Sequence, residues 1–333
     1  MTNTKSFIIL KDGKIVLENY LNGHSDTTYW YWASAAKSLM AVIVGKAQEE
    51  GYLNIEDSTS TYIGSGWTSC SSSQERNIKI KHQLMMTTGI NDIGVDLDCI
   101  DDTCLYFLDT PNSRWAYHNA PYLLLRDVVE SATGQGINTY INLKLNTQIG
   151  MFGFFGVNNT NLFYSNTRSM ARFGLLVLNQ GKWNGSSILN DSIYFNQMIN
   201  TSQPLNESYG YLWWLNGKNS YMHPRIQFTF NGSLISNAPT DMISALGKNG
   251  QIINIVPSKN MVIVEGINIA TRHVKAGTGA KETGFVQKEL PIHISNLIFK
   301  DPDSGKSGRV KIEKLSDGAS SRVVVESKKS EGK

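Results

Sequence analysis

The chain has 333 residues, a formal net charge of +3 and 41% hydrophobic residues, enough apolar material for one large core or two lobes. It has no apolar run near the roughly 20 residues that span a bilayer, so we expect no membrane partner. Its histidines and cysteines lack metal-ligand spacing, and no glycine-rich phosphate or dinucleotide motif is present, so we expect neither a metal nor a cofactor.

Residues 6–20 predict a β-hairpin. Two strand-forming runs, Ser6–Leu10 and Lys14–Tyr20, flank the turn pair Asp12-Gly13, which is a typical hairpin signal. The residues before the first strand contain no apolar segment of the kind that forms an export signal. We expect the hairpin to begin an antiparallel sheet.

The segment 33–53 predicts a helix that carries a nucleophile. Its apolar residues recur with a helical period, and Gly51 follows where a helix would stop. Ser34 and Lys37 stand at i and i+3, so both project from one face. A serine hydroxyl needs a neighbouring base, and a buried amine can lose its proton through desolvation. Ser34 is therefore the predicted nucleophile, favoured also by the helix dipole, and Lys37 is its base.

A second candidate group, Tyr117-His118-Asn119, follows about eighty residues downstream. A tyrosine from another segment can carry the proton from the base to the leaving group. Tyr117 is therefore predicted to be catalytic, whereas His118 is interpreted as a wall or packing residue.

The three cysteines are Cys70, Cys99 and Cys104. The last two lie in an acidic stretch that contains Asp96 and Asp98, and they form either a short-loop disulfide or two free thiols. The stretch lacks the spacing of a calcium loop. We interpret it as a solvated acidic loop.

Ser34-Ala35-Ala36-Lys37 and Tyr117-His118-Asn119 together resemble the motifs of the serine β-lactamase, penicillin-binding-protein and esterase superfamily. Further segments resemble motifs of that family and follow in the family's order: Ile78–Gly89, Trp115–Asn119 with Gly134 after it, Ile149–Met151, Met170–Gly174 and Tyr209–Trp214. The resemblance implies an α/β (α+β) fold of the β-lactamase/transpeptidase type. It would have an antiparallel sheet flanked by helices and a mostly helical lobe over about 55–200. Asn119 and Gly247 would contact the substrate.

The third motif of the family is Lys-Thr-Gly or His-Thr-Gly on a strand beside the site. Lys248-Asn249-Gly250 matches at first sight, but Gly250–Pro257 resembles the following strand, so Gly250 cannot also close the preceding one. We favour a second register that places Ala245-Leu246-Gly247 on the motif. The backbone N–H groups of Ser34 and Lys248 then form the oxyanion hole, typically worth about 3–4 kcal/mol per donor. This register resembles the esterase and 6-aminohexanoate-oligomer hydrolase branch.

The composition changes near residue 270. Every Trp and Tyr precedes Met222, and residues 271–333 contain 13 Lys and Arg against 8 Asp and Glu. This region resembles the C-terminal part of the KOW-type large-subunit ribosomal protein in Val262–Asn268, Arg272–Lys275, Lys288–Asn296, Asp301–Lys306, Arg309-Val310 and Asp317-Gly318. We interpret the chain as a chimaera of a hydrolase domain, 1–265, and a basic, partly disordered tail, 266–333. The ribosomal β-barrel half is absent, so we expect no nucleic-acid binding.

The predicted function is that of a serine hydrolase cleaving a small ester or amide through an acyl-Ser34 intermediate. A D-Ala-D-Ala carboxypeptidase or β-lactamase is the alternative enzyme. A non-catalytic penicillin-recognising protein or an inactive gene-fusion product is the alternative of another class, and the presence of Ser34, Lys37 and Tyr117 argues against it.

The resemblance also leads to expectations about location and assembly. It implies export to the periplasm, although no signal peptide is present in this chain. The first and last helices of the family have no counterpart in this sequence. One face of the sheet would therefore be open, and a homodimer could cover it.

Overall fold

The computed structural model describes residues 4–156 and 162–266 with their side chains. Beyond residue 266 it describes the backbone of five strands: β14 (Ile269–Val274), β15 (Gly284–Glu289), β16 (Phe299–Lys300), β17 (Ser307–Lys314) and β18 (Ser320–Val325). Strands β14 and β15 pair antiparallel, as do β16 with β17 and β17 with β18. The predicted disorder at the end of the tail concerns residues outside the described ones.

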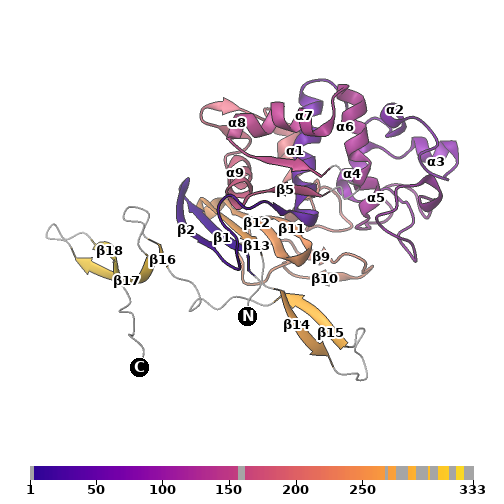
Figure 1. Cartoon of the computed structure of the whole chain (residues 1–333). Helices are drawn as coiled ribbons and strands as arrows, with labels where there is room; N and C mark the ends of the chain where they lie inside the picture. Colours follow the sequence, from indigo (N-terminus) through magenta and orange to yellow (C-terminus); the bar gives the residue numbers. More distant parts are fainter. Residues whose placement is uncertain are drawn as a thin grey trace.

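A six-stranded antiparallel sheet forms the centre of the structure (Figure 1), with the strand order β2-β1-β13-β12-β11-β8. The predicted hairpin is present as β1 and β2, and β1 pairs with β13 from the other end of the region, so that Ile8 faces Val264. The strands are β1 (Ser6–Lys11), β2 (Lys14–Tyr20), β8 (Trp214–Leu215), β11 (Ile243–Gly247), β12 (Gln251–Val256) and β13 (Met261–Gly266).

The two faces of this sheet are buried to different extents. Alternate residues point to opposite faces of a strand. Ile8, Ile253 and Val262 are 0% exposed on the inner face, whereas Phe7 and Ile263 on the outer face are only half-buried among the described residues. The outer face is therefore partly open in the part of the chain that the structure describes.

Helix α9 (Thr167–Leu178) covers the inner face, as Figure 1 shows. Gly174 allows this close packing, because a Cβ there would lie 2.5 Å from Val262 Cγ1 and 2.9 Å from Ile253 Cγ2. Any side chain at this position would push the helix away from the sheet.

The predicted nucleophile helix is present as α1 (Ala36–Glu49), preceded by a 3-10 turn, Ala33–Ala35. Most of α1 is buried, between the sheet and the helical lobe. Gly45 faces the Tyr194 ring, and the Tyr194 hydroxyl donates to the Ala41 carbonyl at 2.6 Å. The core thus holds α1 rigidly, as a helix carrying catalytic groups requires.

Helices and loops between the sheet strands form the other lobe, and the predicted fold class is confirmed. A second apolar cluster, which includes Trp67, Leu105 and Leu124, packs within it. The helices are α2 (Ser60–Ile63), α3 (Ser72–Arg76), α4 (Ile80–Met85), α5 (Asn119–Leu123), α6 (Leu125–Thr133), α7 (Ile137–Ile141), α8 (Thr147–Ile149) and α10 (Ser192–Met198). The small strands are β3 (Trp30–Tyr31), β4 (Gly153–Phe155), β5 (Phe163–Ser165), β6 (Lys182–Trp183), β7 (Ser186–Ser187), β9 (Ser220–Met222) and β10 (Thr229–Asn231).

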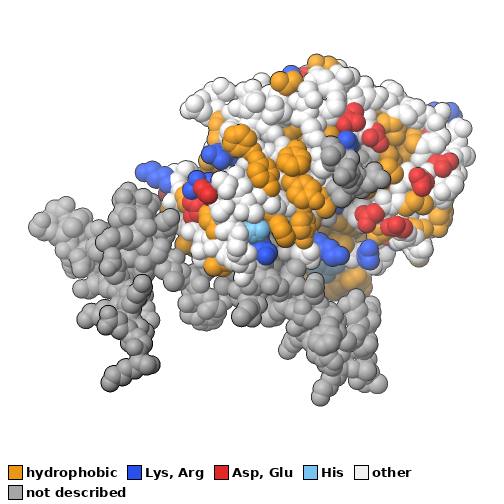
Figure 2. Space-filling view, viewed as in Figure 1, with side chains coloured by type: hydrophobic (Ala, Val, Ile, Leu, Met, Phe, Trp, Pro, Cys, Tyr) orange, Lys and Arg blue, Asp and Glu red, His pale blue; other side chains and the backbone are white. Residues whose placement is uncertain are grey.

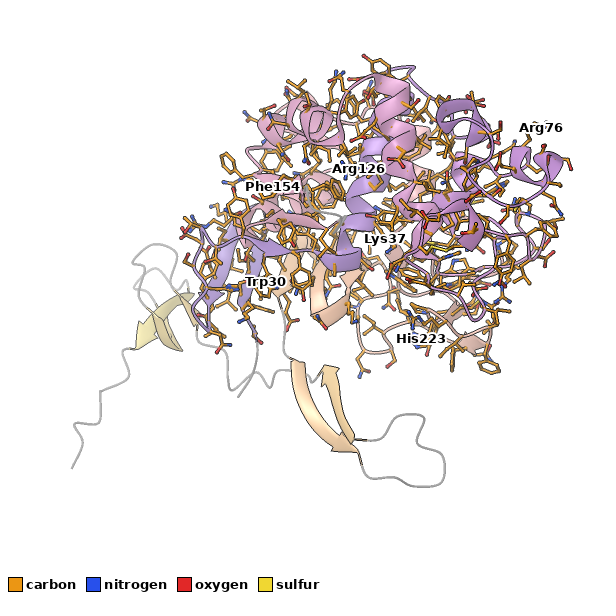
Figure 3. All side chains as sticks on the ribbon, turned by 45° about the vertical axis from the view of Figure 1, so that its right-hand side comes forward. Trp30, Lys37, Arg76, Arg126, Phe154 and His223 are labelled. Atoms are coloured by element: carbon orange, nitrogen blue, oxygen red, sulfur yellow. A yellow bond between two sulfur atoms is a disulfide. The ribbon has the colours of Figure 1, made fainter. Side chains whose placement is uncertain are left out.

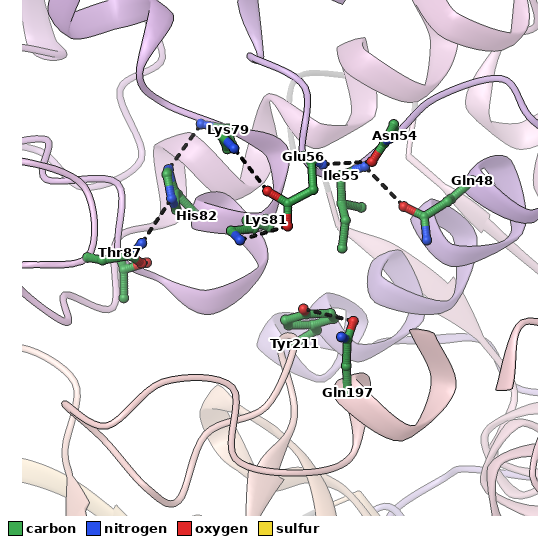
Figure 4. Close-up of polar contacts among 11 residues, drawn as sticks. Gln48, Asn54, Ile55, Glu56, Lys79, Lys81, His82, Thr87, Gln197 and Tyr211 are labelled. Atoms are coloured by element: carbon green, nitrogen blue, oxygen red, sulfur yellow. Dashed lines mark hydrogen bonds and ion pairs between the residues drawn. The ribbon is translucent and has the colours of Figure 1, made fainter. Parts of the chain in front are cut away.

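Polar contacts fix the segment that leads from α1 to α4 (Figure 4). Glu56 accepts from Lys79 Nζ at 2.9 Å and from Lys81 Nζ at 2.7 Å. The Ile55 N–H donates to Gln48 Oε1 of α1 at 3.0 Å. These contacts tie the helical lobe to the end of the nucleophile helix.

Hydrophobic side chains gather on one surface over β3, β4 and β5 (Figure 2). Trp30 and Phe154 belong to it and are 37% and 46% exposed. Single exposed aromatic residues are ordinary, but here several occur together.

Candidate active site

Ser34 lies in the turn that precedes α1, and it lines a cavity. Before it, Trp32 is fully buried, and its indole N–H donates to Ser165 Oγ at 2.7 Å. Ala33 then has a φ of +47°, a left-handed conformation that costs energy for a residue with a Cβ. The buried Trp32 and the strained Ala33 together aim Ser34 out of the core and into the cavity.

Lys37 contacts Ser34 directly, as the i, i+3 spacing predicts. The Lys37 Nζ lies 3.0 Å from Ser34 Oγ and donates to Asn119 Oδ1 at 2.8 Å. The rings of Tyr117 and Tyr122 approach Nζ, with centroids at 4.9 and 4.4 Å. Figure 3 labels Lys37 near the start of α1, inside the molecule.

Burial changes the proton affinity of Lys37. Its side chain is 3% exposed, and desolvation lowers the pKa of Lys37 from 10.5 to about 7, although the negative charge of Asp98 partly opposes the shift. A large fraction of the amine is therefore neutral near pH 7. A neutral amine at this distance can accept the Ser34 proton.

Tyr117 reaches the same point from the segment before α5. Its ring stacks on Trp214 with centroids 5.7 Å apart. Burial raises the pKa of Tyr117 to about 12, and a hydrogen bond with Ser34 partly opposes this shift. Tyr117 thus stays protonated at neutral pH and can supply a proton.

The end of β11 packs against the nucleophile turn. Strand β11 ends at Gly247, and Gln251, which pairs with Gly247, begins β12. Gly250 therefore does not close β11; it lies in the intervening turn, one residue before β12, whereas the second register placed it at the start of that strand. A Cβ on Gly247 would lie 2.4 Å from the Trp32 carbonyl oxygen and 3.0 Å from the Ala35 nitrogen. The chain thus passes directly from this contact to Lys248.

Asn119 has a second contact that the sequence analysis missed. Its Nδ2 donates to Asp98 Oδ1 at 2.7 Å, while its Oδ1 accepts from Lys37. Asp98 is exposed, as the prediction of a solvated acidic loop requires, but its hydrogen bond with Asn119 was not predicted. Neither spacing nor composition marks Asp98 among the acidic residues of its loop.

Two further sequence interpretations concern residues near Asn119. His118 is 2% exposed and does not line the cavity, and burial lowers the pKa of His118 to about 4, which fits a packing role. Of the two alternatives for the cysteines, the structure has the Cys99–Cys104 disulfide, with Cα atoms 6.0 Å apart, and Cys70 is a free thiol.

The cavity has a volume of about 720 Å³. Ser34, Tyr117, Asn119, Gly247 and Lys248 all line it, so the structure brings every predicted site residue except the buried Lys37 to its wall. The remaining lining residues are mostly apolar, with two basic ones: Leu97, Trp214, Pro224, Leu234, Ile235, Leu246, Gly250, Ile252, His223 and Arg225. No carboxylate is among these described lining residues. Figure 3 labels His223 near β9 and β10, below Lys37 in that view.

Within the described ranges, no group of three or more His, Cys, Asp or Glu side chains could hold a metal ion. No helix among the described residues is long and apolar enough to cross a bilayer.

Comparison with known proteins identifies two families in this chain. Residues 4–281 match the family model of Beta-lactamase, and residues 267–330 match that of large ribosomal subunit protein uL24, C-terminal domain. The uL24 protein of Magnetococcus marinus is 45% identical over 78 residues, which are 23% of this chain and 69% of that protein.

Two solved structures share the fold of the larger part. A proposed 6-aminohexanoate-dimer hydrolase from Bacillus anthracis has a TM-score of 0.63 at 21% identity, covering 79% of this chain and 73% of that one. A proposed β-lactamase from Bacteroides dorei has a TM-score of 0.65 at 14% identity, covering 85% and 89%. Both sequence resemblances are thus confirmed, and the chain belongs to the β-lactamase family and carries a C-terminal segment of the uL24 family.

Proposed function

We propose that this protein is a serine hydrolase that cleaves a small ester or amide through an acyl-Ser34 intermediate. The observation that carries the proposal is the 3.0 Å contact between Ser34 Oγ and Lys37 Nζ in a site where burial brings the pKa of Lys37 to about 7. A buried amine of this kind is a general base at neutral pH.

The proposed reaction has two steps, acylation of Ser34 and hydrolysis of the acyl-enzyme. Neutral Lys37 takes the Ser34 proton while Oγ attacks the carbonyl carbon, and the protonated tyrosine Tyr117 gives its proton to the leaving oxygen or nitrogen. Lys37 then returns its proton to Tyr117, which leaves an ester on Ser34. Water hydrolyses this ester, releasing the acid and restoring the Ser34 hydroxyl.

The negative charge that develops on the carbonyl oxygen needs donors in fixed positions. The backbone N–H groups of Ser34 and Lys248 are our proposed oxyanion hole. The close packing of Gly247 on the Ser34 turn supports this assignment, because it brings the chain of Lys248 next to the nucleophile.

The lining of the cavity supports an apolar acyl group. Leu246, Ile252 and Trp214 belong to it, and the buried Ala245 stands where the antibiotic-handling relatives have the motif lysine. Without that lysine, the site has one cation fewer to bind a substrate carboxylate. We therefore favour neutral esters and linear amides as substrates.

A D-Ala-D-Ala carboxypeptidase or β-lactamase activity is the second candidate. Arg225 and Lys248 line the cavity, and neither forms an ion pair with another described residue. These cations could hold the carboxylate that such substrates carry.

In this proposal, no residue of the tail takes part in the reaction. We propose a hydrolase domain over 1–265 and a uL24-like tail over 266–333 that binds no nucleic acid. A homodimer over the outer sheet face and export from the cytoplasm are further proposals. The latter draws on the family and on the Cys99–Cys104 disulfide, since such bonds persist in oxidising compartments.

Intact-mass labelling with a fluorophosphonate tests the proposal. We expect a single adduct on Ser34, together with turnover of short p-nitrophenyl esters or linear amides from a panel that also contains cephalosporins. Absence of both the adduct and turnover would favour a non-catalytic protein.

A further inference from the structure

A continuous chain of hydrogen bonds leads from the loop that contains Asp98 to the nucleophile. Asp98 Oδ1 accepts from Asn119 Nδ2 at 2.7 Å, Asn119 Oδ1 accepts from Lys37 Nζ at 2.8 Å, and Nζ lies 3.0 Å from Ser34 Oγ. Each link joins a donor to an acceptor without conflict. The loop is thus connected to the reacting oxygen through three contacts.

The direction of this chain depends on the carboxylate. An ionised carboxylate only accepts hydrogen bonds, whereas an amide has one donating and one accepting end. Asp98 can therefore accept a hydrogen bond only from the NH₂ group of the Asn119 amide, and this orientation points the amide oxygen toward Lys37. Without Asp98, the amide could rotate and present its NH₂ group to the amine.

We propose that Asp98 is a positioning residue, which fixes the orientation of the Asn119 amide and thereby holds the Lys37 amine against Ser34. This inference rests on the proposed serine hydrolase function. It concerns a residue outside the motifs that suggested that function.

The loop is built to hold Asp98 in place. The Leu97 carbonyl accepts from the Ala120 N–H of α5 at 2.8 Å, and Leu97 is 8% exposed. On the other side of Asp98, the Cys99–Cys104 disulfide closes the loop, and Leu105, which follows it, is fully buried in the second apolar cluster. Support of this kind keeps a functional group within a narrow range of positions.

Asp98 also acts on Lys37 through its charge. Among the described residues, the titratable groups Tyr117 and Tyr122 face the Lys37 amine, and the charge of the Asp98 carboxylate raises the pKa of Lys37. Substitutions can separate orientation from charge. Asp98→Asn keeps an acceptor oxygen and removes the charge, whereas Asp98→Ala removes both.

The test measures the rate of fluorophosphonate labelling at Ser34 as a function of pH. We expect Asp98→Ala to label about ten- to a hundredfold more slowly, because a small misplacement of a catalytic group has an effect of this size. Asp98→Asn should keep most of the plateau rate, and its acid limb should move to lower pH because the neighbouring negative charge is gone.

Asp102→Asn is the matched control, because it removes an equal charge from the same loop. The Asp102 carboxylate accepts from the neighbouring Thr103 N–H at 2.9 Å and does not line the cavity, so we expect a wild-type rate and pH profile. A wild-type rate and pH profile in both Asp98 variants would overturn the inference. Thermal unfolding of each variant shows whether slow labelling reflects loss of the fold.

A second readout does not depend on activity. In a ¹³C-lysine NMR titration, with the Lys37 signal assigned by its loss in Lys37→Arg, Asp98→Asn should shift the titration of Lys37 to lower pH. Asp98→Ala should shift it further, because the Asn119 amide can then turn its NH₂ group toward the amine. If the wild type failed to label but the two variants differed in this way, the proposed function would fail and the inference would stand. Equal Lys37 titrations in the two Asp98 variants would contradict the inference, whatever the activity.

Discussion

The two parts of this chain relate to known proteins in opposite ways. The tail belongs to a family whose member is 45% identical over 78 residues, whereas the larger part is only 21% and 14% identical to solved structures that share its fold. Yet the chemistry that we propose comes from the larger part, where the buried Lys37 meets Ser34 and Asn119 at the wall of the cavity. Sequence identity therefore does not indicate which part of this chimaera carries the function.

The first prediction has the largest effect and tests whether the larger part is an enzyme. Ser34→Ala removes the nucleophile, so covalent labelling should vanish and turnover should fall by about 10⁴-fold or more. Intact mass and ester hydrolysis measure the two effects.

Ser38→Ala is the matched control for this change. Ser38 lies one turn further along α1, and its hydroxyl donates to the Leu212 carbonyl at 2.7 Å. The loss of this hydrogen bond should cost about 1 kcal/mol of stability and leave labelling intact. Labelling of Ser34→Ala at another serine would disprove our assignment of the nucleophile.

The second prediction concerns the base. Only neutral Lys37 can accept the Ser34 proton, and because burial lowers the pKa of Lys37 to about 7, kcat/KM should rise as the pH increases through about 7. Lys37→Met should lower kcat/KM about 10³-fold, within the usual range for loss of a general base. Stopped-flow assays over pH 5–9 measure both effects.

Lys46→Met provides the comparison on the same helix. Lys46 pairs with Glu49 at 2.7 Å and does not line the cavity, so its loss should leave the pH profile unchanged. If the wild-type rate stayed constant from pH 5 to 9, Lys37 would not be the titrating base.

Much of this site was predictable because it depends on local spacing and on strand order. The i, i+3 spacing placed Lys37 beside Ser34, and the strand boundaries at Gly247 and Gln251 agree with the favoured register. Asp98 was not predictable, since its contact with Asn119 joins residues 21 positions apart through loop packing. No periodicity distinguishes Asp98 from the other acidic residues of its loop.

The same limit applies to the fold. Alternation and turn residues predicted the hairpin, and the family resemblance implied the sheet and the helical lobe. The close approaches that make these elements fit, such as Gly174 against Val262 and Gly247 against Trp32, depend on three-dimensional contacts. A glycine in the sequence does not reveal which backbone or side chain it will meet.

A third prediction concerns substrate preference within the larger part. With Ala245 in place of the motif lysine, p-nitrophenyl butyrate should have a kcat/KM at least about tenfold higher than a cephalosporin, the effect of losing one charged hydrogen bond. Arg225→Gln is the informative variant, because Arg225 lines the cavity. A cephalosporin preferred by the wild type and lost selectively in Arg225→Gln would favour the β-lactamase or peptidase alternative instead.

The last prediction has the smallest expected effect on activity and tests where the two parts meet. Strand β13 (Met261–Gly266) lies between β1 and β12 and is paired along its whole length with both. The hydrolase fold therefore needs the chain up to Gly266. Limited proteolysis should cut first between Thr271 and Gly284, and the remaining core should label at Ser34 within about twofold of the intact rate, because every described residue that lines the cavity at Ser34 precedes the tail.

Two truncations sharpen this test. A chain that ends after Asn268 keeps β13 and should fold and label, whereas a chain that ends after Pro257 loses β13. In the shorter chain the hairpin of β1 and β2 would have no partner strand, and the buried Val262 and Val264 would no longer fill the core under α9. It should therefore lose cooperative unfolding as well as labelling. If the chain ending after Asn268 also failed to fold, or if the tail resisted protease as well as α1 does, then the uL24-like segment would be part of the hydrolase fold after all.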